Sequence, residues 1–165
     1  MSRLLVSFML LSLSLCMASN HDQSRQEAEY YVAAYARHYN VPIEFVRAIV
    51  DQESGWQTCP VSPKGAVGLM QLMPETARRL NVQNRCDANQ NVSGGVRYLA
   101  WLMSQFRGDL RLVAAAYYAG ERAVQTRGLN YSNRDVVSYV MSVRRRFDRE
   151  KRLGGGDSWL RWRRR

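Results

Sequence analysis

The chain has few residues of the kinds that bind metals or cofactors. Its 165 residues include three cysteines and two histidines. His21 and His38 have no ligand-like spacing with the cysteines, so we expect no metal and no cofactor. Long apolar runs are also scarce. The one near the start of the chain is shorter than the roughly 18–20 residues of a membrane-spanning helix, so a permanent membrane anchor is not expected.

The start of the chain has the layout of a secretory signal peptide. Arg3 precedes an uncharged, leucine-rich run, which is followed by small and polar residues. Cleavage after Ala18 would place Cys16 and Ala18 at the two positions that need small residues. A lipidated Cys16 fits less well, because Leu15 is too large for the residue before it. We therefore expect a signal peptide over residues 1–18 and export of the remainder.

The remainder is long enough for one domain with its own core, which we place at residues 19–152. It keeps two cysteines, Cys59 and Cys86. In an exported protein such a pair favours a disulfide, worth roughly 3–4 kcal/mol for a loop of this length. Two free thiols or half of a metal site are the alternatives.

The net charge of +10 is distributed unevenly. Residues 144–165 carry ten basic and three acidic side chains, whereas residues 20–143 carry thirteen and eleven. The domain is therefore near neutral and has no internal basic block, which argues against a folded nucleic-acid-binding face. After the domain, residues 153–165 form a predicted tail, in which a glycine-rich link leads to two tryptophans and several arginines.

Helical periodicity runs through most of the domain, and no segment has a convincing strand pattern. Ser24 begins a capping box that predicts the start of a first helix. We interpret the Asn91 region as a helix cap and Trp101 as a core residue. Further helices are predicted after Pro42, at residues 73–80, from about 91, at 109–119, at 121–126 and from about 132. The predicted fold is all-α and compact, with about six to seven helices.

Two carboxylates stand near the end of the helix predicted after Pro42, in "VRAIVDQESGWQ". Glu53 follows Ile49 by four residues and Val46 by seven, so it continues the apolar stripe. Asp51 lies about 200° round the helix and is expected on the surface. The spacing therefore predicts that Glu53 points to the interior or to a cleft.

The setting of Glu53 predicts a raised pKa. Gly55 indicates the end of the helix, where the backbone dipole is unfavourable to a carboxylate, and partial burial disfavours the charged form. A carboxyl group with a pKa of roughly 6–7 is suited to general acid catalysis near neutral pH. A buried structural glutamate is the alternative that these residues leave open.

Several motifs follow one another in the chain: "QESGWQ", "SPKGAVGLMQLMPETARRL", "ANQNVSGGVRYLAWL" and "AAAYYAG". In this order and spacing they resemble the soluble lytic transglycosylase family, over roughly residues 33–147. The resemblance implies a fold related to goose-type lysozyme, with a groove. It also implies cleavage of peptidoglycan glycan strands between N-acetylmuramic acid and N-acetylglucosamine, in the periplasm.

The resemblance also implies roles for individual residues. Glu53 matches the catalytic glutamate of the family, and Tyr139 matches a tyrosine that hydrogen-bonds this glutamate. The substrate groove would be formed by residues that match the motifs around them, namely Ser54, Gly68, Met70, Gln71, Tyr117 and Tyr118. If Gln71 is buried among apolar neighbours, a sugar hydroxyl or amide would satisfy it.

We find no second acid in a setting comparable to that of Glu53. Glu75, Asp109, Glu121 and Asp135 stand at apparent helix starts, where they favour the helix dipole. Hydrolytic glycosidases commonly use two carboxyl groups. A single one fits the family mechanism, in which the substrate supplies the nucleophile and the product is a 1,6-anhydro-muramoyl end.

The chain departs from the family pattern after Tyr117. Tyr118 replaces the usual asparagine, and Glu121-Arg122 replace the usual Pro-Gly. This departure supports one alternative, an inactive peptidoglycan-binding or scaffold component. A lysozyme-like hydrolase acting on the same substrate is a second alternative. By analogy with small members of the family, the expected partner is a secretion, conjugation or pilus apparatus. The tail has no specific partner, or it binds an anionic membrane, anionic wall polymer or a partner protein. We do not expect it to bind nucleic acid.

Overall fold

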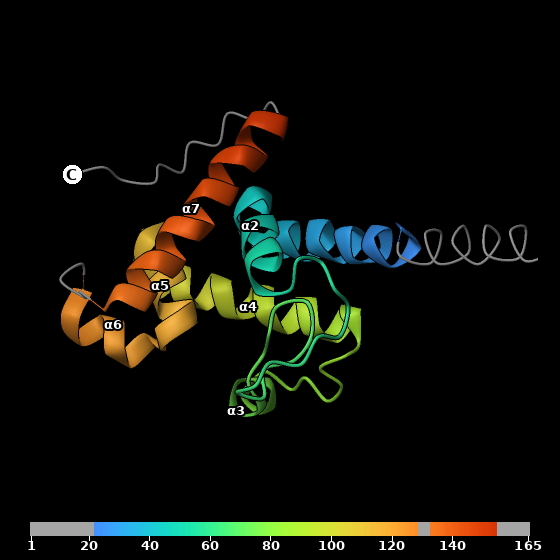
Figure 1. Cartoon of the computed structure of the whole chain (residues 1–165), viewed down its shortest axis with the longest axis horizontal. Helices are drawn as coiled ribbons and strands as arrows, with labels where there is room; N and C mark the ends of the chain where they lie inside the picture. Colours follow the sequence, from blue (N-terminus) through green and yellow to red (C-terminus); the bar gives the residue numbers. More distant parts are fainter. Residues whose placement is uncertain (1–21, 129–132, 155–165) are drawn as a thin grey trace, which may run out of the picture.

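The computed structural model describes residues 22–128 and 133–154, and helices make up most of them (Figure 1). The all-α class is confirmed, because the described residues contain no strand beyond two isolated bridges, Val61 with Val67 and Val67 with Leu72. In chain order the helices are residues 22–38, α2 (Ile43–Glu53), α3 (Pro74–Arg79), α4 (Ala88–Gln105), α5 (Leu110–Ala119), α6 (Glu121–Arg127) and α7 (Arg134–Gly154).

Two of the predicted segments concern parts of the chain that the structure does not cover. The signal peptide at residues 1–18 lies outside the described residues, and so does the tail from residue 155 onward. Both stay predictions. Among the helices that are described, none is long and apolar enough to cross a membrane.

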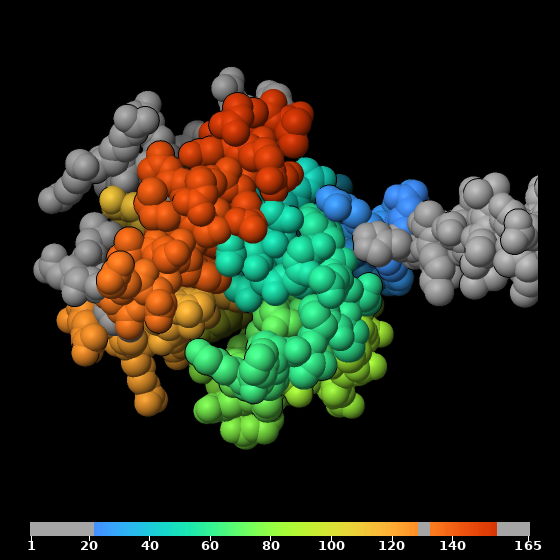
Figure 2. All heavy atoms as spheres, viewed as in Figure 1, coloured from blue at the N-terminus to red at the C-terminus, as the bar shows by residue number. Residues whose placement is uncertain are grey.

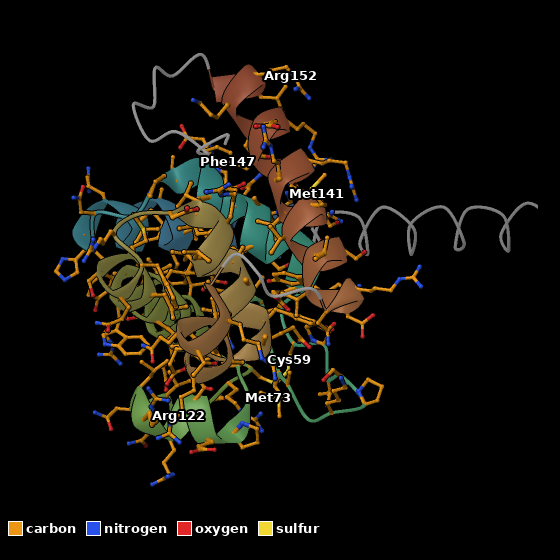
Figure 3. All side chains as sticks on the ribbon, turned by 90° about the vertical axis from the view of Figure 1, so that its left-hand side faces the viewer. Cys59, Met73, Arg122, Met141, Phe147 and Arg152 are labelled. Atoms are coloured by element: carbon orange, nitrogen blue, oxygen red, sulfur yellow. A yellow bond between two sulfur atoms is a disulfide. The ribbon has the colours of Figure 1, made fainter. Side chains whose placement is uncertain are left out.

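Helix α7 lies on the outside of the molecule and packs against α2 and α5 (Figure 1, Figure 3). The apolar stripe predicted for α2 is buried, and Phe45 meets Phe147 of α7 edge to face with ring centroids 6.3 Å apart. On α7, Val136, Val143 and Phe147 are buried as well. This packing brings the C-terminal end of α2, which is Glu53, against α7.

The segment between α2 and α3, residues 54–73, has no regular secondary structure but is fixed by a disulfide and by hydrogen bonds. A disulfide joins Cys59 in this segment to Cys86, in agreement with the prediction. The guanidinium of Arg85 donates hydrogen bonds to the carbonyl oxygens of Gly65 at 2.7 Å and Leu72 at 3.0 Å. These contacts fix the loop against the segment that leads into α4.

Three local predictions were wrong. Residues 22 and 23 are already helical, so Ser24 lies inside the first helix and does not cap it. Helix α4 begins three residues before Asn91, and its N-cap is Asp87, whose side chain accepts from the backbone N–H of Gln90. Trp101 is 37% exposed instead of lying in the core.

Candidate active site

Glu53 and Tyr139 form the centre of the candidate site. Glu53 is the last residue of α2, and Tyr139 projects from α7, which packs along α2. The Tyr139 hydroxyl donates a hydrogen bond to Oε1 of Glu53. The ring of Tyr139 is buried, whereas Glu53 keeps partial access to solvent. The two residues are 86 positions apart in the sequence, so the contact depends on the packing of α7 on α2.

The environment of Glu53 holds its proton more tightly than water would. Burial raises the pKa of Glu53 from the ordinary 4.5 to about 7, and the hydrogen bond from Tyr139 opposes the shift by stabilising the carboxylate. A carboxyl group with this pKa is present in both protonation states near neutral pH. It can therefore donate a proton and later accept one.

The hydroxyl groups of two tyrosines beside Glu53 stay protonated and donate hydrogen bonds. Burial and the nearby Glu53 carboxyl raise the pKa values of Tyr117 and Tyr139 well above 10. The Tyr117 hydroxyl does not bind Glu53 but donates to the carbonyl oxygen of Met70 at 2.7 Å. Tyr117 thus connects α5 to the predicted groove segment, and Tyr139 connects α7 to the carboxyl group.

The groove segment predicted at Gly68 to Gln71 forms a tight turn, which the side chain of Gln71 helps to close. Gly68 and Gln71 both have positive φ, 86° and 46°, which makes a tight turn. The side-chain amide of Gln71 donates to the carbonyl oxygens of Pro60 and Gly68, each at 3.0 Å. The hydrogen-bonding partners that a buried Gln71 was expected to need are thus supplied to its amide nitrogen by the loop. Met70 contributes no side chain to the surface, because it is fully buried.

Asn91 is the residue that sequence reasoning missed. Its side chain is fully buried, accepts from the backbone N–H of Met70 at 2.8 Å, and donates to the carbonyl oxygens of Val67 at 3.0 Å and Arg85 at 2.8 Å. It therefore holds the turn that carries Gly68. The one available signal was a polar residue within the apolar stripe of α4, among Val92 and its neighbours.

Ser54 lies next to Glu53 but is turned toward the backbone. Its hydroxyl donates to the carbonyl oxygen of Val50 at 3.1 Å and accepts from the backbone N–H of Trp56 at 3.1 Å. Ser54 is buried, and these bonds end the helix. The geometry gives this side chain a role in placing Glu53 at the helix end.

A hollow of about 550 Å³ lies between α3 and the α5–α6 connection. Figure 2 shows it between the green segment that contains α3 and the orange segment that contains α6. Tyr117 and Tyr118 contribute to its wall, together with Met73, Arg79, Tyr98, Glu121 and Arg122.

Glu121, which stands where the family resemblance leads one to expect proline, is engaged in this wall. It accepts a hydrogen bond from the Tyr98 hydroxyl at 3.0 Å and lies 3.4 Å from Arg79 Nη1. Although burial opposes the shift, its hydrogen bonds and the Arg79 charge hold the pKa of Glu121 below the usual value. Trp101 stacks on Tyr98 beside this network, with ring centroids 5.9 Å apart.

Tyr118 stands between this hollow and a second one of about 300 Å³. The second hollow is also lined by Tyr139 and by polar side chains of α7. Tyr118 is 46% exposed, and its ring stacks on that of Tyr139 with centroids 4.6 Å apart. The departure from the family pattern therefore lies in direct contact with the partner of Glu53.

Asp51 lies on the other side of α2, as its spacing predicts, but it is not an isolated surface charge. Its Oδ2 lies 2.8 Å from Arg146 Nε and 2.8 Å from Arg149 Nη2, both on α7. The two carboxylates of the "VDQES" stretch are therefore separated in role. Asp51 links α2 to α7, while Glu53 meets Tyr139. No cluster of three potential metal-binding side chains occurs within residues 22–128 and 133–154.

The Transglycosylase SLT domain family matches residues 30–139 of the chain. Among curated proteins, the membrane-bound lytic murein transglycosylase F of Pseudomonas fluorescens is 38% identical over 102 residues, which are 62% of this chain and 21% of that protein. The soluble lytic murein transglycosylase of Escherichia coli K12 is 33% identical over 120 residues, which are 66% of this chain and 19% of that protein. The chain thus spans about a fifth of the length of these relatives.

Solved structures agree with the sequence matches. An inactive Glu-to-Gln mutant of the lytic transglycosylase Slt from Pseudomonas aeruginosa superposes with a TM-score of 0.70 at 25% identity, over 81% of this chain and 25% of that one. The 70 kDa soluble lytic transglycosylase of Escherichia coli gives 0.69 at 27% identity, over 82% and 26%. The similarity covers one part of these larger proteins.

Proposed function

The chain belongs to the Transglycosylase SLT domain family, and we propose that it cleaves peptidoglycan glycan strands as a lytic transglycosylase. The observation that carries this proposal is the pairing of Glu53, whose pKa is about 7, with the Tyr139 hydroxyl. The two hollows that meet at Tyr118 support it, because they lie beside this pair. The inactive Glu-to-Gln mutant of the Pseudomonas aeruginosa enzyme is consistent with a glutamate as the essential group.

In the proposed reaction Glu53 acts twice. As the acid, it protonates the glycosidic oxygen between N-acetylmuramic acid and N-acetylglucosamine while the C1–O bond breaks. The N-acetyl group of the substrate stabilises the cationic C1 centre. As the carboxylate, Glu53 then takes the proton from the C6 hydroxyl, whose oxygen bonds to C1. The products are a 1,6-anhydro-muramoyl end and a free N-acetylglucosamine 4-hydroxyl, with Glu53 again protonated.

The proposed site of action is the cell envelope, where the predicted signal peptide would deliver the domain. Peptidoglycan is the substrate named by the murein transglycosylases that the chain resembles. Local opening of the wall for a secretion, conjugation or pilus apparatus is proposed on family analogy. Contact of the predicted tail with an anionic membrane or with wall polymer is proposed on its arginines and tryptophans.

The test is digestion of purified sacculi by the parent protein and by Glu53→Gln, with the products identified by mass spectrometry. We expect anhydro-muramoyl ends from the parent and at least about a 100-fold lower rate from Glu53→Gln, because the amide cannot donate a proton. Glu44→Gln makes the same change in the first turn of the same helix and is the control. It should digest at the parent rate.

Other products or rates would select the other functions. Reducing muramic acid ends from the parent would identify a hydrolase. Binding of sacculi without release of products would identify a binding component. An unchanged rate in Glu53→Gln would exclude Glu53 as the acid.

A further inference from the structure

A chain of contacts leads from the surface of the molecule to the Glu53 carboxyl group. The ring of Tyr118 on α5 stacks on that of Tyr139 on α7 at a centroid distance of 4.6 Å and an interplanar angle of 26°. The Tyr139 hydroxyl in turn donates to Oε1 of Glu53 at the end of α2. Three helices therefore meet through these three side chains.

We propose that Tyr118 is a positioning residue for the Glu53–Tyr139 pair, whose ring holds the Tyr139 ring in the orientation that keeps its hydroxyl on the carboxyl group. A role of Tyr118 in catalysis rests on the proposed function, in which Glu53 is the acid. The stacking also explains how a chain with tyrosine at this position can keep the pair aligned.

The ring of Tyr118, and not its hydroxyl, makes the relevant contact. Within the described residues the Tyr118 hydroxyl has no hydrogen-bond partner, and the side chain is 46% exposed. One part of the ring covers Tyr139, and the remainder borders the two hollows. Stacking of two aromatic rings favours the stacked arrangement by roughly a factor of 3 to 10.

The hydrogen bond of Tyr139 is the one polar contact that Glu53 makes within the described residues, and it stabilises the carboxylate form. If the Tyr139 ring turns away from the carboxyl group for part of the time, the carboxylate form loses this stabilisation. The pKa of Glu53 is then higher. Removing the Tyr118 ring should raise the pKa of Glu53 by this indirect route. Direct hydration of Glu53 through the opened space would lower it. The two routes have opposite signs and can be told apart.

Few other ionisable groups surround this pair. Tyr117 of α5 faces Glu53 but donates its hydroxyl to Met70. Asp135 and Arg145 of α7 line the smaller hollow beside Tyr118. Neither of these two charged groups is among the causes that set the pKa of Glu53. The pKa of Glu53 therefore reports mainly on burial and on Tyr139.

The experiment is an NMR pH titration of the Glu53 carboxyl carbon in protein labelled with ¹³C at the glutamate side chains. The Glu53 signal is identified by its absence in Glu53→Gln. The variants are Tyr118→Asn, Tyr118→Phe and Tyr139→Phe, and Tyr118→Asn combined with Tyr139→Phe. Tyr30→Asn makes the same change at a tyrosine that is 70% exposed and lies away from the site. The measurement does not depend on turnover, so it is separate from the sacculus assay of the proposed function.

Tyr139→Phe should raise the pKa of Glu53 by about one pH unit, because it removes the hydrogen bond. Tyr118→Asn should raise it by roughly half as much, whereas Tyr118→Phe and Tyr30→Asn should leave it at the parent value. In the Tyr139→Phe background, Tyr118→Asn should produce no further change. Such a pattern would support the role of the Tyr118 ring as acting through Tyr139.

Three results would overturn the proposal. The first is an unchanged Glu53 pKa in Tyr118→Asn. The second is an equal change in both backgrounds, or a lowered pKa, since either shows that Tyr118 acts on Glu53 without Tyr139. The third is the same change in Tyr118→Phe as in Tyr118→Asn, which would assign the effect to the hydroxyl.

Discussion

The buried side chain of Asn91 accepts a hydrogen bond from the backbone N–H of Met70, with 2.8 Å between Oδ1 and the nitrogen. Its amide nitrogen donates to the carbonyl oxygens of Val67 and Arg85. One α4 side chain thus satisfies three backbone groups on two loops. The Tyr117 hydroxyl binds the other side of the same turn at the Met70 carbonyl oxygen. The turn next to the candidate site is therefore clamped from α4 and from α5.

Asn91→Ala should destabilise the protein by about 3 kcal/mol. The substitution leaves three backbone groups without their partner and opens a cavity at a fully buried position. Urea unfolding followed by circular dichroism measures the change in the free energy of unfolding. We also expect slower digestion of sacculi by the fraction that stays folded, because the turn at Gly68 is no longer fixed.

Asn89→Ala is the matched control for this prediction. Asn89 lies two residues earlier on α4, is exposed, and accepts one hydrogen bond from the Tyr35 hydroxyl at 2.6 Å. Its replacement should cost less than about 1 kcal/mol. Equal losses in the two variants would contradict the assignment of Asn91 as the clamp.

Two glycines of the same loop allow a second prediction, because they share a backbone conformation but not an environment. Gly65 and Gly68 have φ of 83° and 86°. A Cβ atom at Gly65 would meet nothing within 4 Å. At Gly68 it would lie 2.2 Å from the carbonyl oxygen of Arg85 and 2.3 Å from Nδ2 of Asn91.

Gly65→Ala should therefore cost about 1 kcal/mol, which is the cost of a positive φ for a residue with a Cβ. Gly68→Ala should cost about 3 kcal/mol or more, because backbone atoms of the neighbouring segment must also move. Urea unfolding of both variants gives the difference, which isolates the effect of the close approach. The close packing of this turn would be refuted by two equal values.

Local patterns were sufficient to predict much of this molecule. The spacing of Glu53 from Val46 and Ile49 predicts the face of α2 on which its side chain lies, because the helical period can be read from neighbouring residues alone. Burial was likewise expected to raise its pKa, and burial is the largest cause of the shift. The contact with Tyr139, 86 residues away, was implied by family resemblance and not by spacing.

Features that depend on distant contacts were not predictable in this way. The partners of Asn91 lie 21 and 24 residues away at Met70 and Val67, so its position in α4 suggested only a helix cap. Gln71 has its partners within the loop, at Pro60 and Gly68, whose approach depends on positive φ angles. Aromatic character alone placed Trp101 in the core, whereas it stacks on Tyr98 at the surface.

The raised pKa of Glu53 also predicts how stability depends on pH. In the unfolded chain the carboxyl group has its ordinary pKa of 4.5, and in the folded protein the value is about 7. Between these values the folded protein binds more protons than the unfolded chain does, so the free energy of unfolding falls as pH rises. The loss should begin above about pH 4.5, be complete above about pH 7, and amount to about 3 kcal/mol.

Glu53→Gln should remove this loss, since the amide does not titrate. The variant should therefore match the parent near pH 4.5 and exceed it in stability by up to about 3 kcal/mol at pH 8, while it loses activity. Urea unfolding of both proteins at these two pH values measures the difference, and Glu75→Gln, at an exposed position in the first turn of α3, accounts for the loss of one surface charge. A difference between Glu53→Gln and the parent that stays constant from pH 4.5 to pH 8 would show that burial of Glu53 does not oppose its ionisation. It would also remove the physical reason for expecting this carboxyl group to be protonated at neutral pH.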